Sequence, residues 1–178
     1  IRKIRQERGM STPAMSLHMV FYGNPGTGKT TIARLLAKIY KSMGLLSKGH
    51  LTEVDRSGLV GGYVGQTALK VREVVEKAKG GVLFIDEAYS LTVNRSATDY
   101  GFEAVDTLLK YMEDNRDDLI VIVAGYTEPM EEFLQSNPGL KSRFNKYIYF
   151  NDYTPEELLA ILEMRAGKNG MKIRPEAK

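Results

Sequence analysis

Residues 23–30 read Gly23-Asn24-Pro25-Gly26-Thr27-Gly28-Lys29-Thr30, which matches the pattern G-x-x-x-x-G-K-[ST] at every fixed position. An apolar stretch, residues 17–22, precedes this loop, and a stretch with helical spacing, residues 31–43, follows it. The order predicts a strand, a tight loop and a helix. Such a loop can cradle phosphate groups, because its glycines let backbone N–H groups approach them and the helix N-terminus adds partial positive charge. We expect this chain to bind a nucleotide.

The same loop pattern predicts what individual side chains do. Lys29 is expected to reach the β and γ phosphates, and Thr30 is expected to hold Mg²⁺. The full set of expected nucleotide-binding residues is Asn24, Pro25, Gly26, Thr27, Gly28, Lys29, Thr30 and Thr31. A plain glycine turn between a strand and a helix is the alternative, and the complete match in the right context argues against it.

Short apolar runs alternate with helical spacing along the rest of the chain. Strands are expected at residues 17–22, 51–55, 82–85, 119–124 and 147–150, and helices at 31–43, 67–79, 102–115, 130–135 and 154–165. This alternation predicts an α/β fold with a parallel five-stranded sheet covered by helices on both faces. One apolar stripe on the first helix is expected to face the sheet, and it comprises Ile32, Leu35, Leu36, Ile39 and Met43.

Two acids, Asp86 and Glu87, follow the apolar run at residues 82–85 directly. Ligands gather at the carboxyl ends of strands in open α/β sheets, so these acids are expected beside the nucleotide. Asp86 would lie behind Mg²⁺ and act on it through water or through Thr30, so that both residues belong to the expected metal site, and Glu87 would polarise the attacking water. Adjacent strand residues point to opposite sides, which allows separate roles. Since the chain lacks an Asn/Thr-Lys-x-Asp guanine-reading motif, hydrolysis of ATP is the favoured reaction.

Composition sets limits on the other functional classes. The chain has 178 residues, of which 43% are apolar and 26% charged, as in an ordinary soluble protein. It has no apolar run long enough for a membrane span and no signal-peptide segment. The absence of cysteine fits a reducing cytoplasm, the expected location. A net charge of +3 with interspersed acids and bases indicates a solvated surface. We therefore expect neither a nucleic-acid nor a membrane partner.

With further stretches added to the nucleotide loop and the acid pair, the chain resembles an AAA+ ATPase. The closer resemblance is to the family of stage V sporulation protein K and CbbX (CfxQ). It covers roughly residues 15–165, and its other matching stretches are residues 47–51, 59–68, 80–90, 99–101, 112–114, 124–126, 136–144 and 152–153. The resemblance implies a P-loop NTPase fold, ATP and Mg²⁺ as cofactors, and a homo-oligomeric ring, expected to be a hexamer. It also implies ATP-driven remodelling of a protein partner whose identity it leaves open.

The resemblance gives roles to residues that the composition leaves unexplained. Tyr63-Val64-Gly65 match the aromatic–aliphatic–glycine triplet that grips polypeptide in a ring's central pore, and residues 94–101 would form a second pore loop. Arg143 matches the arginine finger, which reaches the γ-phosphate held by the neighbouring subunit and joins Lys29 and Glu87 as a catalytic residue. Sensor 1, a polar residue after the fourth strand, is expected at Thr127 or Glu128.

The ends of the chain suggest how it is divided. It begins with Ile1 and stops at Lys178, soon after a helix that the capping box Thr154-Pro155-Glu156-Glu157 starts. These ends predict a fragment of a longer protein. Its expected parts are an N-terminal helix end and linker (residues 1–16), the AAA+ core (17–153) and the beginning of a helical lid (154–178).

Several functions remain compatible with the sequence. A nucleotide-gated assembly scaffold with little turnover is the main alternative to the remodelling ATPase. A nucleic-acid motor is a third possibility, against which the aromatic pore triplet and the small net charge count. The resemblance leaves open a role in sporulation, carbon fixation or secretion.

Overall fold

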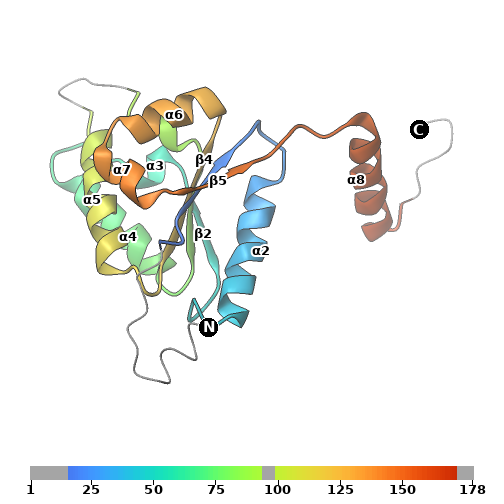
Figure 1. The fold of residues 1–178 in the computed structure, drawn as a ribbon, viewed down its shortest axis with the longest axis horizontal. Coiled ribbons are helices and arrows are strands. Elements are labelled where there is room, and N and C mark those ends of the chain that lie inside the picture. Colours follow the sequence, from blue (N-terminus) through green and yellow to red (C-terminus); the bar gives the residue numbers. More distant parts are fainter. Residues whose placement is uncertain (1–15, 94–98, 172–178) are drawn as a thin grey trace.

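Five parallel strands form a single sheet in the order β2-β3-β4-β1-β5 (Figure 1). The strands are β1 (Met19–Tyr22), β2 (Leu51–Val54), β3 (Val82–Ile85), β4 (Ile120–Gly125) and β5 (Lys146–Tyr149). The structure, a computed structural model, describes residues 16–93 and 99–171. Residues 1–15, residues 94–98 of the expected second pore loop and residues 172–178 of the expected lid lie outside the described residues.

Seven α-helices and one 3₁₀ helix connect and follow these strands in the described part of the chain. They are α2 (Lys29–Ser42), α3 (Arg56–Leu59), α4 (Gln66–Ala78), the 3₁₀ helix η1 (Ala88–Leu91), α5 (Gly101–Asp114), α6 (Thr127–Gln135), α7 (Pro138–Arg143) and α8 (Pro155–Lys168). The sequence did not predict α3, η1 or α7. Each of these has only four or six residues, too few for apolar periodicity to show.

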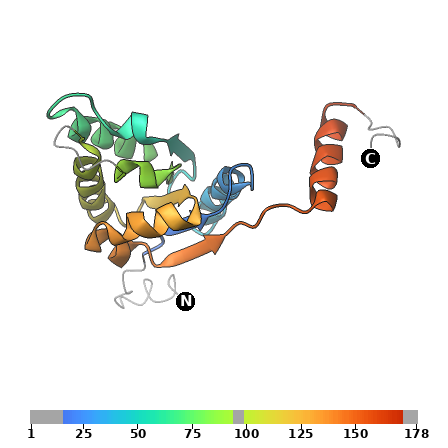
Figure 2. The same cartoon turned by 90° about the horizontal axis from the view of Figure 1, so that it is seen from above.

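The strand order explains which helices cover which face of the sheet. The chain runs from β1 through α2 to β2 at one edge, and then returns through β3 and β4 toward β5 at the other edge. Connections between parallel strands are right-handed, so reversing direction moves the helices to the opposite face. Accordingly, α2 packs on one face, and α4, α5, α6 and α7 pack on the other (Figures 1 and 2). The predicted fold class is confirmed.

The predicted apolar stripe of α2 does not face the sheet. Four of its five members are exposed, and only Leu36 is partly buried in the contact with the sheet: Ile32 is 37%, Leu35 52%, Ile39 39% and Met43 62% exposed. The buried side belongs to the smaller Ala33 and Ala37, which contact a cluster around Phe21 and Phe84. The sequence prediction assigned the buried face of α2 to its large apolar residues. The alanines are buried instead, because their small side chains let the helix lie close to the bulky strand residues.

Helix α8 stands apart from the rest of the molecule in both views (Figures 1 and 2). It begins with the predicted capping box: the Thr154 hydroxyl accepts from the Glu157 N–H at 3.2 Å, and the Glu157 carboxylate accepts from the Thr154 N–H at 2.9 Å. None of its residues is buried. Within residues 16–93 and 99–171, no helix combines the length and apolarity that crossing a bilayer requires.

His18, immediately before β1, is a buried part of the sheet's support. Its Nδ1 accepts a hydrogen bond from the Val121 N–H at 2.9 Å, and its ring contacts Phe144. Burial first, and then the positive charges of Arg143 and Lys146, lower the pKa of His18 from 6.5 to about 4. The folded state therefore holds this ring neutral across the pH range in which the unfolded chain protonates it.

This difference should make stability depend on pH. Between pH 6.5 and about 4 the unfolded chain binds a proton at His18 that the folded chain does not, so stability falls as pH falls through this window. We expect a loss of about 3 kcal/mol in the free energy of unfolding from this residue. Denaturant melts at several pH values would measure it. His18→Asn retains a hydrogen-bond acceptor and should flatten the dependence of the free energy of unfolding on pH. His50→Asn should leave that dependence as it is in the wild type. If His18→Asn shows the same slope of unfolding free energy against pH as the wild type, His18 is not the source of the dependence.

Candidate active site

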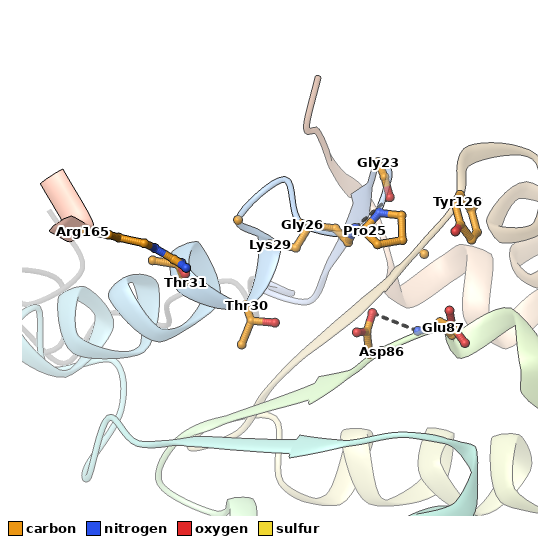
Figure 3. A pocket seen from close by; sticks show the side chains of 12 residues that line it. Gly23, Pro25, Gly26, Lys29, Thr30, Thr31, Asp86, Glu87, Tyr126 and Arg165 are labelled. Atoms are coloured by element: carbon orange, nitrogen blue, oxygen red, sulfur yellow. Dashed lines mark hydrogen bonds between the residues drawn. The ribbon is translucent and has the colours of Figure 1, made fainter. Parts of the chain in front are cut away.

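A cavity of about 290 Å³ opens at the carboxyl ends of β1, β3 and β4 (Figure 3). This volume is close to the lower end of the usual range for small-molecule sites. Its lining residues are Gly23, Pro25, Gly26, Gly28, Lys29, Thr30, Thr31, Asp86, Glu87, Gly125, Tyr126 and Arg165. Six of the eight residues expected to bind nucleotide thus meet both predicted acids in one pocket. Arg165, from the otherwise exposed α8, was not anticipated.

The glycine loop has the backbone shape that phosphate binding needs. Gly26 and Gly28 have φ angles of 79° and 91°, in the left-handed region where a side chain would be strained. Gly28 also lies so close to the Tyr153 hydroxyl that a Cβ atom there would approach it to 2.9 Å. Thr27 stabilises the turn from within, since its hydroxyl donates to the Asn24 carbonyl at 2.8 Å. Glycine is therefore required at these positions by geometry.

Lys29 is folded against the loop that precedes it. Its Nζ donates to the Gly23 and Asn24 carbonyls, each at 2.7 Å, and the residue is 9% exposed. Burial lowers the pKa of Lys29, while the negative charges of Asp86 and Glu87 oppose that shift. The ammonium group therefore has a fixed position beside the pocket. A phosphate group there would give it an anionic partner in place of two neutral carbonyls.

Thr30 and Asp86 supply the ligand types that Mg²⁺ prefers. Both line the pocket, and the Thr30 hydroxyl points toward the Asp86 carboxylate in Figure 3. Among the described residues, no group of three histidine, cysteine or acidic side chains could hold a metal ion by itself. Mg²⁺ is usually held by one or two carboxylates together with substrate phosphates and water. The residues present therefore fit this ion when a nucleotide accompanies it.

Glu87 has an unusual backbone. Strand β3 ends at Ile85, so the two acids do not continue the strand as the sequence suggested. Glu87 has φ 47° and ψ 44°, and it is the one non-glycine residue with positive φ among the described residues. Its side chain lines the nucleotide pocket and also a neighbouring cavity of about 580 Å³, whose other walls include Arg56 and Gly62. Glu87 thus lies between the pocket and the expected pore loop.

Three hydrogen bonds tie the glycine loop to the segment that follows β5. The Asn24 side-chain amide donates to both carboxylate oxygens of Asp152 at 2.9 Å, and the Tyr153 hydroxyl donates to the Thr27 carbonyl at 3.0 Å. Sequence reasoning gave Asp152 and Tyr153 no role beyond their place in the resemblance. Their partners lie more than 120 residues earlier in the chain, a separation across which no local pattern operates.

The residue that faces the pocket after β4 is Tyr126. It precedes α6 in an extended conformation, with φ −66° and ψ 147°. The sensor 1 candidates Thr127 and Glu128 are the first residues of α6, and neither is among the described residues that line the pocket. The sequence signal for Tyr126 was its place directly after a buried strand.

The expected pore triplet is exposed at the tip of a loop between α3 and α4. Tyr63 is 74% and Val64 84% exposed, and Gly65 precedes α4 with φ 81°. The base of this loop is fixed, because the Gly61 N–H donates to the fully buried Thr67 hydroxyl at 2.9 Å. An exposed aromatic tip on a fixed base is suited to contact with a partner.

Arg143 ends α7 and does not line the pocket of its own chain. Its guanidinium lies 3.6 Å from the Glu113 carboxylate and donates to the Gly139 carbonyl at 3.3 Å. Its Nε is buried without a hydrogen-bond partner in the described part of the chain. Lys141, in the same helix, is exposed. Any action of Arg143 on a phosphate therefore requires a second copy of the chain or a change in shape.

Comparison with known proteins places this arrangement in context. A family model described as "ATPase family associated with various cellular activities (AAA)" matches residues 19–152. Ribulose bisphosphate carboxylase/oxygenase activase, chloroplastic, of Cyanidioschyzon merolae is 49% identical over 177 residues, which are 99% of this chain and 60% of that protein. Protein CbbX of Cereibacter sphaeroides is 49% identical across 99% of this chain and 57% of that protein, and stage V sporulation protein K of Bacillus subtilis is 48% identical across 99% of this chain and 55% of that protein.

The chain thus spans 55% to 60% of the length of these three curated relatives. Among solved structures, the crystal structure of the FIGL-1 AAA domain in complex with ADP superposes with a TM-score of 0.62. It is 22% identical, and the match covers 92% of this chain and 53% of that one. At that identity the likeness supports the fold alone.

Proposed function

Because this chain belongs to the AAA family of ATPases, we propose that it hydrolyses ATP within a ring of identical subunits and uses the reaction to remodel a protein partner. The observation that carries the proposal is the pocket in which a glycine loop, Lys29, Thr30, Asp86 and Glu87 meet. Each of these groups suits one part of a Mg²⁺–ATP complex. We further propose a hexameric ring in the cytoplasm.

The chain's own residues divide the chemistry among them. The N–H groups of the glycine loop and the Lys29 ammonium bind the phosphates and orient them. Thr30 and Asp86 would hold Mg²⁺, which offsets phosphate charge when bound. Glu87 would accept a proton from the water that attacks the terminal phosphate, which requires its carboxylate to be ionised and directed into the pocket.

The second cavity supports a link from hydrolysis to mechanical work. Glu87 contributes to its wall together with Arg56, Ser57 and Val60, which lie at the base of the loop that carries Tyr63. A movement of the Glu87 side chain on hydrolysis would therefore be transmitted to the loop that is proposed to contact the partner. The exposed Tyr63 ring would grip an extended polypeptide of varied sequence. The names of two relatives fit a protein partner in carbon fixation or sporulation.

The first test is ATP turnover as a function of protein concentration, for this chain and for a version lengthened to match the curated relatives. A site completed by a neighbouring subunit should give a specific rate that rises with concentration. Tight nucleotide binding with flat, negligible turnover in both proteins would overturn the ATPase and favour the assembly scaffold.

Tyr63→Ala tests the remodelling part of the proposal. The side chain is exposed and lies outside the nucleotide pocket, so basal turnover should stay within about twofold of wild type. Processing of a protein partner should fall at least about tenfold, since the gripping ring is lost. Leu69→Ala, an exposed apolar change on α4, is the matched control. Partner processing that survives Tyr63→Ala unchanged would rule out this loop as the grip, and turnover stimulated by nucleic acid would favour a motor instead.

A further inference from the structure

Arg56, the first residue of α3, joins three segments of the chain through one side chain. Its Nη1 donates to the Ser90 carbonyl at 2.5 Å, and its Nη2 donates to the Asp99 carboxylate at 2.8 Å. Ser90 lies in η1, which follows Glu87, and Asp99 lies two residues before α5. A guanidinium at the base of the Tyr63 loop therefore holds both the turn after β3 and the segment that leads into α5.

The contact between Arg56 and Asp99 is a largely buried ion pair. The Asp99 side chain is 5% exposed and the Arg56 side chain 29%. Asp99 Oδ1 also accepts from the Gly101 N–H at 2.8 Å. A Cβ atom at Gly101 would come within 2.0 Å of the Leu91 carbonyl oxygen and 3.0 Å of Arg56 Nη1. Glycine at this position therefore lets the start of α5 lie close to η1 and to the guanidinium.

Hydrogen bonds continue from Arg56 in both directions. Toward the nucleotide, the Ser90 N–H donates to the Glu87 carbonyl at 2.9 Å, within the turn where Glu87 has its left-handed backbone. Toward the loop, the Arg56 carbonyl accepts from the Val60 N–H at 2.9 Å. Glu87 and Arg56 also share the wall of the cavity of about 580 Å³. A series of short, directed contacts thus runs from the Glu87 turn through one guanidinium to the Tyr63 loop.

A separate contact holds the same loop to α4. Lys70 Nζ donates to the Val60 carbonyl at 2.9 Å and to the Ser57 carbonyl at 3.1 Å. Lys70 is not among the described residues that line the nucleotide pocket. Of these two cations, Arg56 is the one whose hydrogen bonds also reach η1.

We propose that Arg56 is a positioning residue that couples the Tyr63 loop to the nucleotide pocket. This inference rests on the proposed ATPase function and deepens it, since it names the side chain through which the pocket acts on the loop. When the Glu87 turn shifts on binding or hydrolysis of ATP, the Ser90 carbonyl shifts with it. The guanidinium follows that carbonyl, with Asp99 keeping it directed there, and α3 moves because Arg56 is its first residue.

A tryptophan in the loop would report this coupling without any need for turnover. The chain contains no tryptophan, so Tyr63→Trp places a single fluorescent reporter at an exposed position. Emission is recorded without nucleotide and with a non-hydrolysable ATP analogue and Mg²⁺, and the two spectra should differ. Arg56→Gln in the reporter protein should reduce that difference at least about fivefold. Nucleotide affinity should stay within about twofold, because Arg56 lies outside the pocket lining.

Two further variants separate coupling from simple support of the loop. Lys70→Gln is the matched control, because it removes the other cation that holds the loop. It should shift the emission equally with and without nucleotide and leave the difference between the two states unchanged. Arg56→Lys keeps a positive charge beside Asp99, so it remains informative if Arg56→Gln does not fold. It should also lose most of the difference, because an ammonium group lacks the planar fork that spans two acceptors.

The outcomes distinguish the role of Arg56 from the proposed function. A full nucleotide-dependent difference in Arg56→Lys, or an equal loss in Lys70→Gln, would overturn the role of Arg56 and leave the ATPase intact. The same holds if emission with Arg56 in place is identical with and without bound nucleotide. Failure of the wild-type protein to bind or hydrolyse ATP would instead overturn the proposed function itself.

Discussion

Arg143→Ala should lower ATP turnover about 10³- to 10⁵-fold, the effect associated with removal of an arginine finger. The structure motivates this because Arg143 lies outside the pocket of its own chain, so it would act on a neighbour's nucleotide. Nucleotide affinity should stay near the wild-type value. The measurement is turnover and nucleotide binding across protein concentrations, with Lys141→Ala on the same helix as the control. Full turnover in Arg143→Ala would remove this residue from the site.

Mixing variants provides a sharper version of this test. In a ring, a subunit with Arg143→Ala still has Glu87, and a neighbour with Glu87→Gln still has Arg143. Mixed rings should therefore contain some complete sites and regain part of the turnover that each variant lacks alone. No regain would mean that both residues act within one subunit, contrary to the proposal.

Glu87→Gln should lower turnover about 10²- to 10⁴-fold, the usual contribution of a general base. The amide is close in size to the carboxylate but cannot accept the proton from the attacking water. Binding of ATP should persist, because Lys29 and the glycine loop are unchanged, and the nucleotide should be retained as ATP. Stopped reactions separated by chromatography would measure this. Glu73→Gln, at an exposed position on α4, is the control, and rapid turnover by Glu87→Gln would contradict the assignment of the base.

Much of the fold was predictable because its strands and long helices have local signals. Residues 82–85 form a fully buried strand with the predicted bounds, since a short, continuous apolar run between glycines and acids is typical of a strand covered on both faces. The resemblance to the family of CbbX and stage V sporulation protein K is confirmed by relatives of those names at 48% and 49% identity. These nearly equal identities do not separate the biological roles.

What the sequence did not predict depends on contacts between distant segments. The buried face of α2 is set by how closely Ala33 and Ala37 let it approach Phe21 and Phe84, which spacing alone does not encode. The left-handed conformation of Glu87 depends on the surroundings of η1, because the sequence there gives no glycine signal. Tyr126 reaches the pocket because α6 begins one residue after it, earlier than the apolar spacing of that helix indicated.

The hydrogen bonds from Asn24 to Asp152 and from Tyr153 to Thr27 have a mechanical consequence. They fasten the nucleotide loop to residues 152 and 153, just before α8, a helix of 14 residues, and so about 21 Å long, in which no residue is buried. A rotation of about 10° at this fastening would carry the far end of the helix through about 4 Å. In the proposed ring, the segment after β5 would then be the pivot of a lever arm, which would convert a small adjustment around a phosphate into a displacement large enough to alter the contact with a neighbouring subunit.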